Sequence, residues 1–362
     1  MTTEELFSLR IRVPAEDVRQ QARKQWDAVM KPIDGLGDFE KMICRIAAVR
    51  GTTDPDITRK ALIIMCADNG VVVHGVSQTD AHVTNDVAVM MGQRKSSAGI
   101  MAGAFPVEIL TVDVGIASDR TPAGVIDRKV RKGTADLLTE PAMTAEECLQ
   151  AIETGIEMAR LCSEKGIGLI ATGEMGIGNT TTSAALVCAT TGASPAEVVG
   201  RGAGLSDEGL RTKLSVVEDA LAFHFGARHA GCADSPDGAF EALRRVGGLD
   251  IAGLAGVFIG GATLGIPVVI DGLISAAAAL CAERMVPGCR ASMIASHSGR
   301  ERGTAAVLRE LGLRPVIDAD LALGEGSGAL MLFPLLDMAM SLYRDGTRFD
   351  GSGIDPYERF GG

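Results

Sequence analysis

GLIATGEMGIGNTTTSAALV, residues 168–187, carries more information about the architecture of this chain than any other segment. The apolar residues 168–172 predict a buried strand, the next turn contains Gly173, Gly176 and Gly178, and residues 179–182 open a helix. A strand, a glycine-rich turn and a helix start place backbone N–H groups at the positive end of a helix dipole, where proteins hold phosphate or carboxylate groups. The segment therefore predicts an anion site, with an ordinary glycine-rich strand-to-helix turn as the alternative.

The glycine spacing in this turn is neither GxGxxG nor GxxxxGK[ST]. It therefore does not support a Rossmann dinucleotide site or a P-loop nucleotide-hydrolase site. An unrelated nucleotide-binding protein of the Rossmann type is disfavoured for the same reason.

Apolar runs elsewhere in the chain extend the same pattern. They lie at residues 61–67, 107–116, 266–272, 290–298 and 314–318, and several end in Asp or Gly before a helical segment. Strands alternating with helices are typical of a parallel sheet whose ligands bind at the carboxyl ends of the strands. The predicted fold class is α/β, with a mostly parallel Rossmann-like sheet and helices on both faces.

The two ends of the chain have a helical pattern. We expect residues 1–60 and about 335–362 to form a small helical domain, and residues 61–334 to form a large α/β domain with the nucleotide and base sites. No linker or low-complexity segment separates the two.

Composition excludes several classes of protein. The chain has 362 residues, 46% of them hydrophobic, and a formal charge of −11, which argues against binding to nucleic acid. Its eight cysteines show no CxxC spacing, and no apolar stretch approaches twenty residues, so we expect a reduced cytoplasmic protein. The five histidines are dispersed, and we expect neither a metal nor a cofactor.

A second glycine-rich loop, residues 200–209, leads into a helix that carries Lys213. We expect N–H groups of both loops to bind a phosphate, with the Lys213 ammonium adding positive charge; a surface lysine is the alternative. Glu174, inside the first turn, is suited to accept hydrogen bonds from ribose hydroxyls.

Glu325 is the most suggestive acid, because it is flanked by glycines in LGEGSG and followed by an apolar helix. Partial desolvation would raise its pKa toward the range of a general base, whereas an exposed loop acid is the alternative. Asp68, Asp113 and Asp271 follow strands, and for each of them capping of the next helix is the favoured interpretation.

Five ordered motifs resemble those of the nicotinate-nucleotide–dimethylbenzimidazole phosphoribosyltransferases of cobamide biosynthesis. They are GEMGIGNTTTSAAL, GRGAGLSDEGL-x2-K, IDGLISAAAALCA, the Ser-His pair at 296–297, and LGEGSGAL. The resemblance runs from about residue 22 to residue 336. It implies a large domain with a mostly parallel sheet, a small domain of terminal helices, and a dimer.

The resemblance also implies a reaction. The 5-phosphoribosyl group of nicotinate mononucleotide passes to an aromatic lower-ligand base, giving an α-ribotide and nicotinate without a metal. Glu325 is implied to take the proton. The residues implied for the nucleotide and its phosphate are Glu174, Gly176, Gly178, Asn179, Thr180, Gly202, Lys213, Asp271, Gly272 and Ser296, and those for the acceptor base are Ser77, Asp86 and Leu323.

The chain departs from the family pattern around the acceptor. Asn69 stands in place of a histidine, and Asp80 and Asp86 in place of a proline and a glutamine. Gly299 and Thr304 also replace the second serine and the last histidine of the motif that begins at Ser296. These acids predict a smaller or more polar acceptor than dimethylbenzimidazole, unless both point to solvent.

Two alternatives stay open. The chain could belong to a two-chain enzyme that acts on phenol or p-cresol, or it could be a non-catalytic subunit that pairs with an active homologue. A homodimer is the expectation for a chain that is active alone.

Overall fold

The computed structural model describes residues 1–226 and 233–359. Its main sheet has six parallel strands in the order β3-β2-β1-β4-β5-β6. Their bounds are β1 Lys60–Ala67, β2 Val107–Gly115, β3 Ile126–Asp127, β4 Leu169–Met175, β5 Val268–Ile270 and β6 Met293–Ala295. This is the Rossmann strand order, with the topological switch between β1 and β4. The α/β prediction is confirmed.

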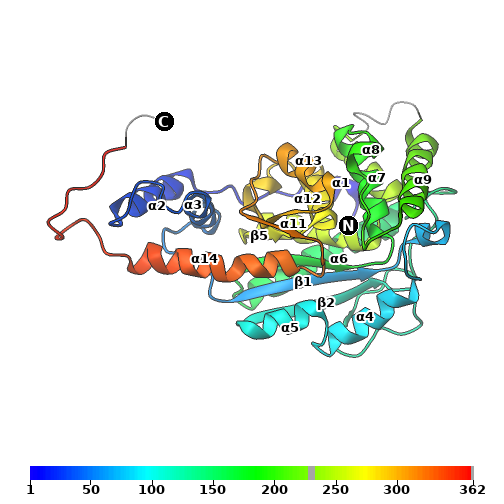
Figure 1. Cartoon of the computed structure of the whole chain (residues 1–362), viewed down its shortest axis with the longest axis horizontal. Helices are drawn as coiled ribbons and strands as arrows, with labels where there is room; N and C mark the ends of the chain where they lie inside the picture. Colours follow the sequence, from blue (N-terminus) through cyan, green and yellow to red (C-terminus); the bar gives the residue numbers. More distant parts are fainter. Residues whose placement is uncertain (227–232, 360–362) are drawn as a thin grey trace.

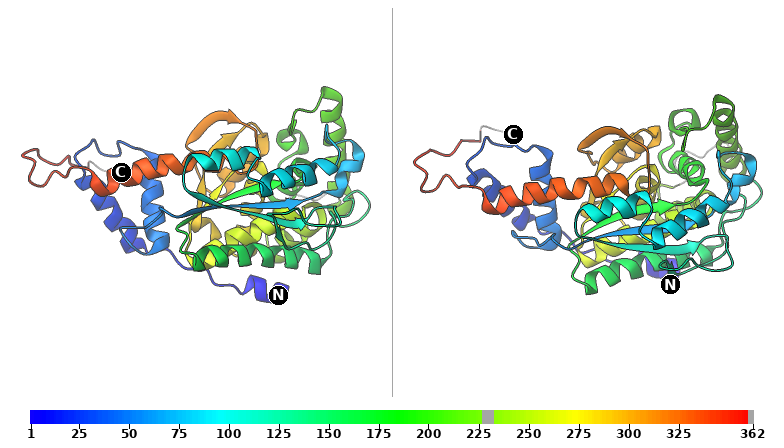
Figure 2. Two further views of the ribbon diagram at one scale, coloured as in Figure 1. Left: turned by 90° about the horizontal axis from the view of Figure 1, so that it is seen from below. Right: turned by 60° about the horizontal axis from the view of Figure 1, so that its bottom comes forward.

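Helices cover both faces of the sheet, and every residue of β1 is buried. Side chains on one face pack against α6 (Ala145–Glu164), α11 (Leu249–Leu264) and α12 (Leu273–Met285). On the other face lie α3 (Asp38–Arg50), α4 (His82–Gly92), α5 (Ser97–Met101) and α14 (Ser327–Asp345). Figure 2 shows α6 and α14 on opposite sides of the strands. Burial from both sides explains why these strands are continuous apolar runs.

The remaining elements connect or flank these layers. They are α1 Thr3–Phe7, α2 Glu16–Ala28, η1 Gly70–His74, η2 Ala102–Ala104, α7 Asn179–Thr191, α8 Pro195–Val198, α9 Asp207–Phe225, α10 Pro236–Val246, η3 Cys289–Ser292, β7 His297–Gly299, α13 Arg302–Glu310 and β8 Ile317–Leu321.

Helices from both ends of the chain pack together at one end of the molecule (Figure 1). The ring centroids of Trp26 in α2 and Tyr343 in α14 are 5.1 Å apart, and Val29 forms a β-bridge with Arg348. We propose that α2, α3 and the end of α14 are the small helical domain. The expected limit near residue 335 falls inside the continuous helix α14, which also reaches the sheet.

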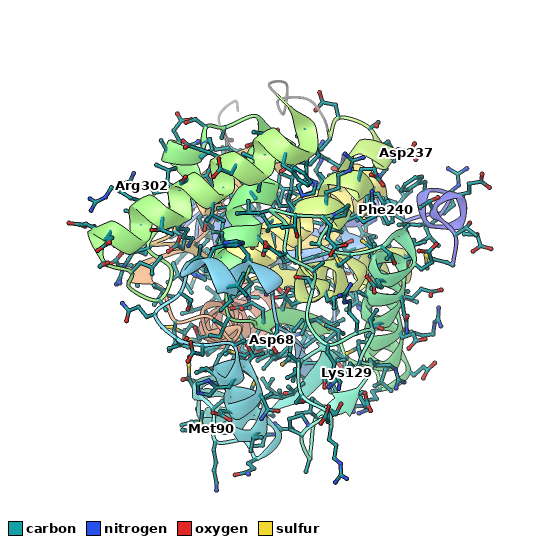
Figure 3. All side chains as sticks on the ribbon, turned by 90° about the vertical axis from the view of Figure 1, so that its right-hand side faces the viewer. Asp68, Met90, Lys129, Asp237, Phe240 and Arg302 are labelled. Atoms are coloured by element: carbon teal, nitrogen blue, oxygen red, sulfur yellow. The ribbon has the colours of Figure 1, made fainter. Side chains whose placement is uncertain are left out.

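The first residues do not join these helices. In α1, Leu6 is buried in the core on the opposite face of the sheet, and Phe7 contacts Phe240 of α10 edge to face at 6.4 Å. Figure 3 shows Phe240 beside this short helix. The Met1 ammonium group pairs with Glu153 of α6. This packing differs from the expectation that the small domain begins at residue 1, because Leu6 finds its apolar contacts in the core beside the main sheet.

The expected strand at 290–298 is two strands in two sheets. The Ser296 hydroxyl donates to the carbonyl oxygen of Ile270 at 2.6 Å, and the carbonyl oxygen of Ser296 accepts from the N–H groups of Val316 and Ile317. These bonds redirect the chain, so that β7 and β8 pair in a separate two-stranded parallel sheet. The strand expected at 314–318 thus begins later and lies outside the main sheet.

In the part of the chain that the structure describes, no helix is long and apolar enough to cross a bilayer. Over these residues, no three His, Cys, Asp or Glu side chains form a group that could hold a metal ion.

Candidate active site

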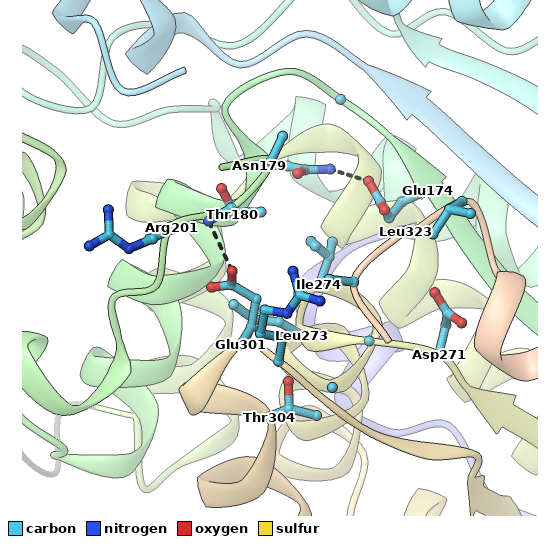
Figure 4. Close-up of a pocket in the computed structure, with 18 of the residues that line it drawn as sticks. Glu174, Asn179, Thr180, Arg201, Asp271, Leu273, Ile274, Glu301, Thr304 and Leu323 are labelled. Atoms are coloured by element: carbon cyan, nitrogen blue, oxygen red, sulfur yellow. Dashed lines mark hydrogen bonds between the residues drawn. The ribbon is translucent and has the colours of Figure 1, made fainter. Parts of the chain in front are cut away.

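A cavity of about 260 Å³ opens at the carboxyl ends of β4 and β5, next to the switch point of the sheet (Figure 4). Its wall combines the β4–α7 turn, the loop after β5, the loop around Gly202, the start of α13 and residues 321–324. The predicted residues among its lining are Ser77, Glu174, Gly176, Gly178, Asn179, Thr180, Gly202, Asp271, Gly272 and Leu323.

Glycine is required at two positions of the β4–α7 turn. Gly178 precedes α7 with a φ of +93°, which L side chains rarely adopt. A Cβ on Gly176 would lie 2.5 Å from the carbonyl oxygen of Ala67 and 2.8 Å from Oδ2 of Asp250. The N–H groups of Asn179, Thr181 and Thr182 already bond to the carbonyl oxygens of Gly176 and Gly178 in the turn itself. Among the described residues the N–H of Thr180 has no such acceptor, so it is the donor that the start of α7 offers at the cavity wall.

Two carboxyl groups share the amide of Asn179. Its Nδ2 donates to Oε2 of Glu174 and, at 2.9 Å, to Oδ2 of Asp250, which is fully buried. Burial raises the pKa of Glu174 to about 7 and that of Asp250 to about 7, and the Asn179 bonds oppose both shifts. Sequence reasoning missed Asp250, because it begins a small-residue helix without any distinguishing pattern.

Asp271 lies in the cavity wall and also caps a helix. Its Oδ1 accepts from the N–H of Ala329 at 3.0 Å, in the first turn of α14. Burial raises the pKa of Asp271 to about 6, against the effect of backbone hydrogen bonds from Ala329, Gly328 and Gly272. The capped helix is α14 and not the next helix, α12, so this carboxyl group joins the end of β5 to the start of α14.

Asp68 and Asp113 have other partners. Oδ2 of Asp68 accepts from the N–H of Ala117 at 2.7 Å, and Oδ1 of Asp113 accepts from the N–H groups of Gly115 and Ile116. Both acids therefore fix the loop that follows β2. Their expected role as caps of the next helix is wrong.

Glu325 occupies a turn of three successive left-handed residues. The φ angles are +84° at Gly324, +58° at Glu325 and +83° at Gly326. Its Oε2 accepts from the N–H of Ala98 in α5 at 2.9 Å, and its own N–H donates to Glu174. The side chain is half-buried, and it lies beside the cavity, whose lining includes the adjacent Gly324. The alternative of a fully exposed loop acid is therefore wrong.

Lys213 is fully buried behind the cavity wall. Its Nζ donates to Oγ1 of Thr180 at 2.8 Å and to the carbonyl oxygen of Gly200 at 3.1 Å, and burial lowers its pKa to about 8. The surface-lysine alternative is wrong. The N–H of Gly202 donates to Oε1 of Glu301 at 2.9 Å, a residue that sequence reasoning did not find.

Ser296 is buried and positions its neighbours. Besides its bond to Ile270, its Oγ lies 2.8 Å from Nδ1 of His297. His297 and Thr304 line the cavity, whereas Ser296 does not. Since Ser296 reaches only other protein groups, the structure brings it near the expected nucleotide site without exposing it there.

The residues expected near the acceptor base do not all lie at the cavity. Ser77 and Leu323 line the cavity, but Asp80 and Asp86 are exposed and lie outside its lining. Thr84 of α4 faces the site and accepts from the N–H of Ile177 at 3.1 Å. Residues two apart on a helix do not face the same way, so Asp86 turns away from the turn that Thr84 contacts. The structure thus leaves Asp86 outside the lining of this cavity, in contrast to the expectation that it belongs to the acceptor pocket.

Comparisons with known proteins cover nearly the whole chain. A family model described as a phosphoribosyltransferase matches residues 11–354. The nicotinate-nucleotide–dimethylbenzimidazole phosphoribosyltransferase of Acetivibrio thermocellus is 40% identical over 336 residues, which are 93% of this chain and 93% of the relative. The protein of that name from Chloroflexus aurantiacus is 40% identical and spans 92% of this chain and 93% of its own.

A solved structure is also similar. The crystal structure of CobT from Thermus thermophilus aligns with a TM-score of 0.87 and 39% identity, over 94% of this chain and 99% of that chain. The family match includes every segment that lines the cavity.

Proposed function

Because the chain belongs to the nicotinate-nucleotide–dimethylbenzimidazole phosphoribosyltransferase family, we propose that it transfers the 5-phosphoribosyl group of nicotinate mononucleotide to an aromatic lower-ligand base of cobamides. The observation that carries the proposal is the cavity at the sheet's switch point, where helix N-terminal donors face buried carboxyl groups. Hydrogen-bond donors suit a phosphate, and carboxylate acceptors suit ribose hydroxyls. The cavity therefore has groups that can bind both the phosphate and the ribose of a phosphoribosyl group.

The donor phosphate binds between the start of α7 and the Gly202 loop, with Lys213 behind it. A lysine ammonium group has three hydrogens, and two of those on Lys213 are used by Thr180 and Gly200. The third is left for the phosphate. Glu174 and Asp271 approach the ribose, and Gly176, Gly178, Asn179, Gly202 and Gly272 complete the nucleotide site.

The reaction breaks the bond between the anomeric carbon and the pyridinium nitrogen and forms a bond from that carbon to the acceptor. Nicotinate leaves with the electron pair, which neutralises its ring, and the acceptor loses one proton. Glu325 receives that proton, since its carboxylate is fixed beside the cavity by Ala98. The enzyme's main contribution is alignment of the two rings.

Glu174 is a second candidate for the proton acceptor. It lines the cavity itself, and its pKa of about 7 matches a base that works near neutral pH. Separate Glu325→Gln and Glu174→Gln variants distinguish the two, because loss of the residue that receives the proton lowers turnover by roughly 10²–10⁴ while nicotinate mononucleotide still binds.

We propose dimethylbenzimidazole as the acceptor, because the acids that pointed to a polar ring lie outside the cavity. The test incubates the purified chain with nicotinate mononucleotide and equimolar dimethylbenzimidazole, adenine, phenol and p-cresol. Nicotinate and the dimethylbenzimidazole ribotide should form in equal amounts. Release of no nicotinate with any base contradicts the proposed reaction, and a dominant phenolic product contradicts only the acceptor.

We propose a homodimer whose contact includes α14. Met331, Met338 and Leu342 are 41%, 61% and 36% exposed and lie on one side of this helix, at spacings of seven and four residues. Exposed apolar patches of this kind mark protein–protein contacts. A cytoplasmic location is supported by the free thiols of all seven described cysteines; Cys232 lies outside the described residues.

A further inference from the structure

Glu301 already occupies one donor of the phosphate cradle. Its Oε1 accepts the Gly202 N–H at 2.9 Å, and Figure 4 shows the carboxyl group reaching this loop beside Thr180. Glu301 stands at the N-cap of α13, but its side chain does not bond to that helix. Its carboxylate therefore serves the loop and the cavity, not the helix.

The loop is shaped to admit this carboxylate. A Cβ on Gly200 would lie 2.0 Å from Oε2 of Glu301, so any side chain there would expel it. Oε2 itself is buried and, among the described residues, has no hydrogen-bond partner. A buried carboxylate oxygen without a donor is costly, which makes this position an unstable resting place for the charge.

The charge nearby favours an anion at this position. The buried Lys213 ammonium is attracted by Glu301, which raises the lysine pKa against the larger lowering caused by burial. A Cβ on Gly202 would lie 3.4 Å from Nζ of Lys213 and 2.9 Å from Oγ1 of Thr180, so the Gly202 backbone sits directly over both. An incoming phosphate would meet the Gly202 N–H that Glu301 already accepts from, close to the Lys213 ammonium group.

We propose that Glu301 is a specificity-determining residue of the donor site, and that its carboxylate competes with the donor phosphate for the Gly202 N–H. The inference rests on the proposed function, because it deepens the phosphate site described there. A phosphate that also reaches the start of α7 displaces the carboxylate and releases Oε2 from burial. A weaker anion that lacks those further contacts does not.

The test is Glu301→Gln, which removes the charge but keeps an oxygen that can accept from Gly202. Isothermal titration in a buffer free of phosphate and sulfate measures the binding of inorganic phosphate and of nicotinate mononucleotide. We expect both to bind about tenfold more tightly to the variant, the effect of removing one competing charge-assisted hydrogen bond. Glu310→Gln, at the other end of α13, removes the same charge far from the loop and should bind like the parent.

If Glu301→Gln binds phosphate as tightly as the parent does, or more weakly, the proposal is overturned. Glu301 would then only fix the loop around Gly202. Absence of phosphate binding by both proteins also overturns it, because the variant should present a vacated cradle. Nicotinate release by the parent protein is measured separately. If the parent releases nicotinate but Glu301→Gln binds no more tightly, the competition fails while the proposed reaction stands.

Discussion

At the scale of single residues, Glu325 combines function with backbone strain. A non-glycine residue at a φ of +58° costs about 1–2 kcal/mol relative to a right-handed conformation. We predict that Glu325→Gly has a free energy of unfolding about 1 kcal/mol higher than Glu325→Ala, because only glycine relieves the strain. Urea denaturation of the two variants measures the difference.

The control for this pair is Glu157, an exposed residue within helix α6. At this position we expect the opposite order of stability: Glu157→Gly should have a free energy of unfolding about 1 kcal/mol lower than Glu157→Ala. If Glu325→Ala matched or exceeded Glu325→Gly in stability, the left-handed turn would not exist in solution.

The buried acid pair predicts how stability changes with pH. Asp250 has a pKa of about 7 in the native state against 3.8 ordinarily, so between these values the native state binds more protons than the unfolded state. The free energy of unfolding therefore falls as pH rises through this window, by up to about 1.4 kcal/mol for each unit of pKa difference. In Asp250→Asn the free energy of unfolding should fall clearly less over this pH range. The remaining fall comes from Glu174 and Asp271, whose pKa values burial also raises.

Urea titrations at pH 5 and pH 8 check this, with Asp237→Asn on the surface of α10 as the control. Identical pH dependence in Asp250→Asn and the parent would show that Asp250 is ionised throughout and that its burial is relieved by other groups.

At the scale of elements, α6 and α11 pack with their backbones unusually close. A Cβ on Gly155 would lie 1.9 Å from the carbonyl oxygen of Gly253, and one on Gly256 would lie 2.0 Å from that of Ile152. We predict that Gly256→Ala lowers the free energy of unfolding by about 1–3 kcal/mol, because the two helices must separate. Gly103→Ala, where a Cβ meets nothing within 4 Å, is the control. A fully stable Gly256→Ala would mean that the helices tolerate a wider spacing.

The elements also show what the sequence could predict. The strand, turn and helix around Gly178 were predictable, because apolar residues, glycines and a helix start follow one another locally. The break between β6 and β7 was not, since it depends on Ser296 bonding to Ile270, which is distant in the sequence. Glu301 and Asp250 were missed for the same reason: each gains its role from a partner that is distant in the sequence, Gly202 for Glu301 and Asn179 for Asp250.

At the scale of the whole molecule, the alternation of apolar strands with helical segments predicted the parallel sheet. The same alternation did not predict where a domain would begin or end. Helix α14 runs from beside the cavity to the helices that we propose as the small domain, and no local feature of the sequence marks that span. The same helix exposes the apolar side proposed for dimer contact.

The Met338 side chain is 61% exposed in the single chain. We predict that Met338→Glu converts dimers into monomers, because a charge buried in an apolar contact is costly. Sedimentation velocity measures the mass. Val13→Glu, on an exposed apolar residue outside α14, should leave the dimer intact. A Met338→Glu protein that sediments as the parent does would place the contact elsewhere.

The proposed reaction and the role of Glu325 are tested together by comparing the parent with Glu325→Gln in a single assay of nicotinate mononucleotide and dimethylbenzimidazole. Nicotinate and ribotide are quantified together, and nicotinate mononucleotide binding is measured on the same preparations. We expect equal amounts of the two products from the parent, turnover lowered by roughly 10²–10⁴ in the variant, and unchanged binding of nicotinate mononucleotide. Turnover of Glu325→Gln within about threefold of the parent, or no ribotide from the parent, would contradict it.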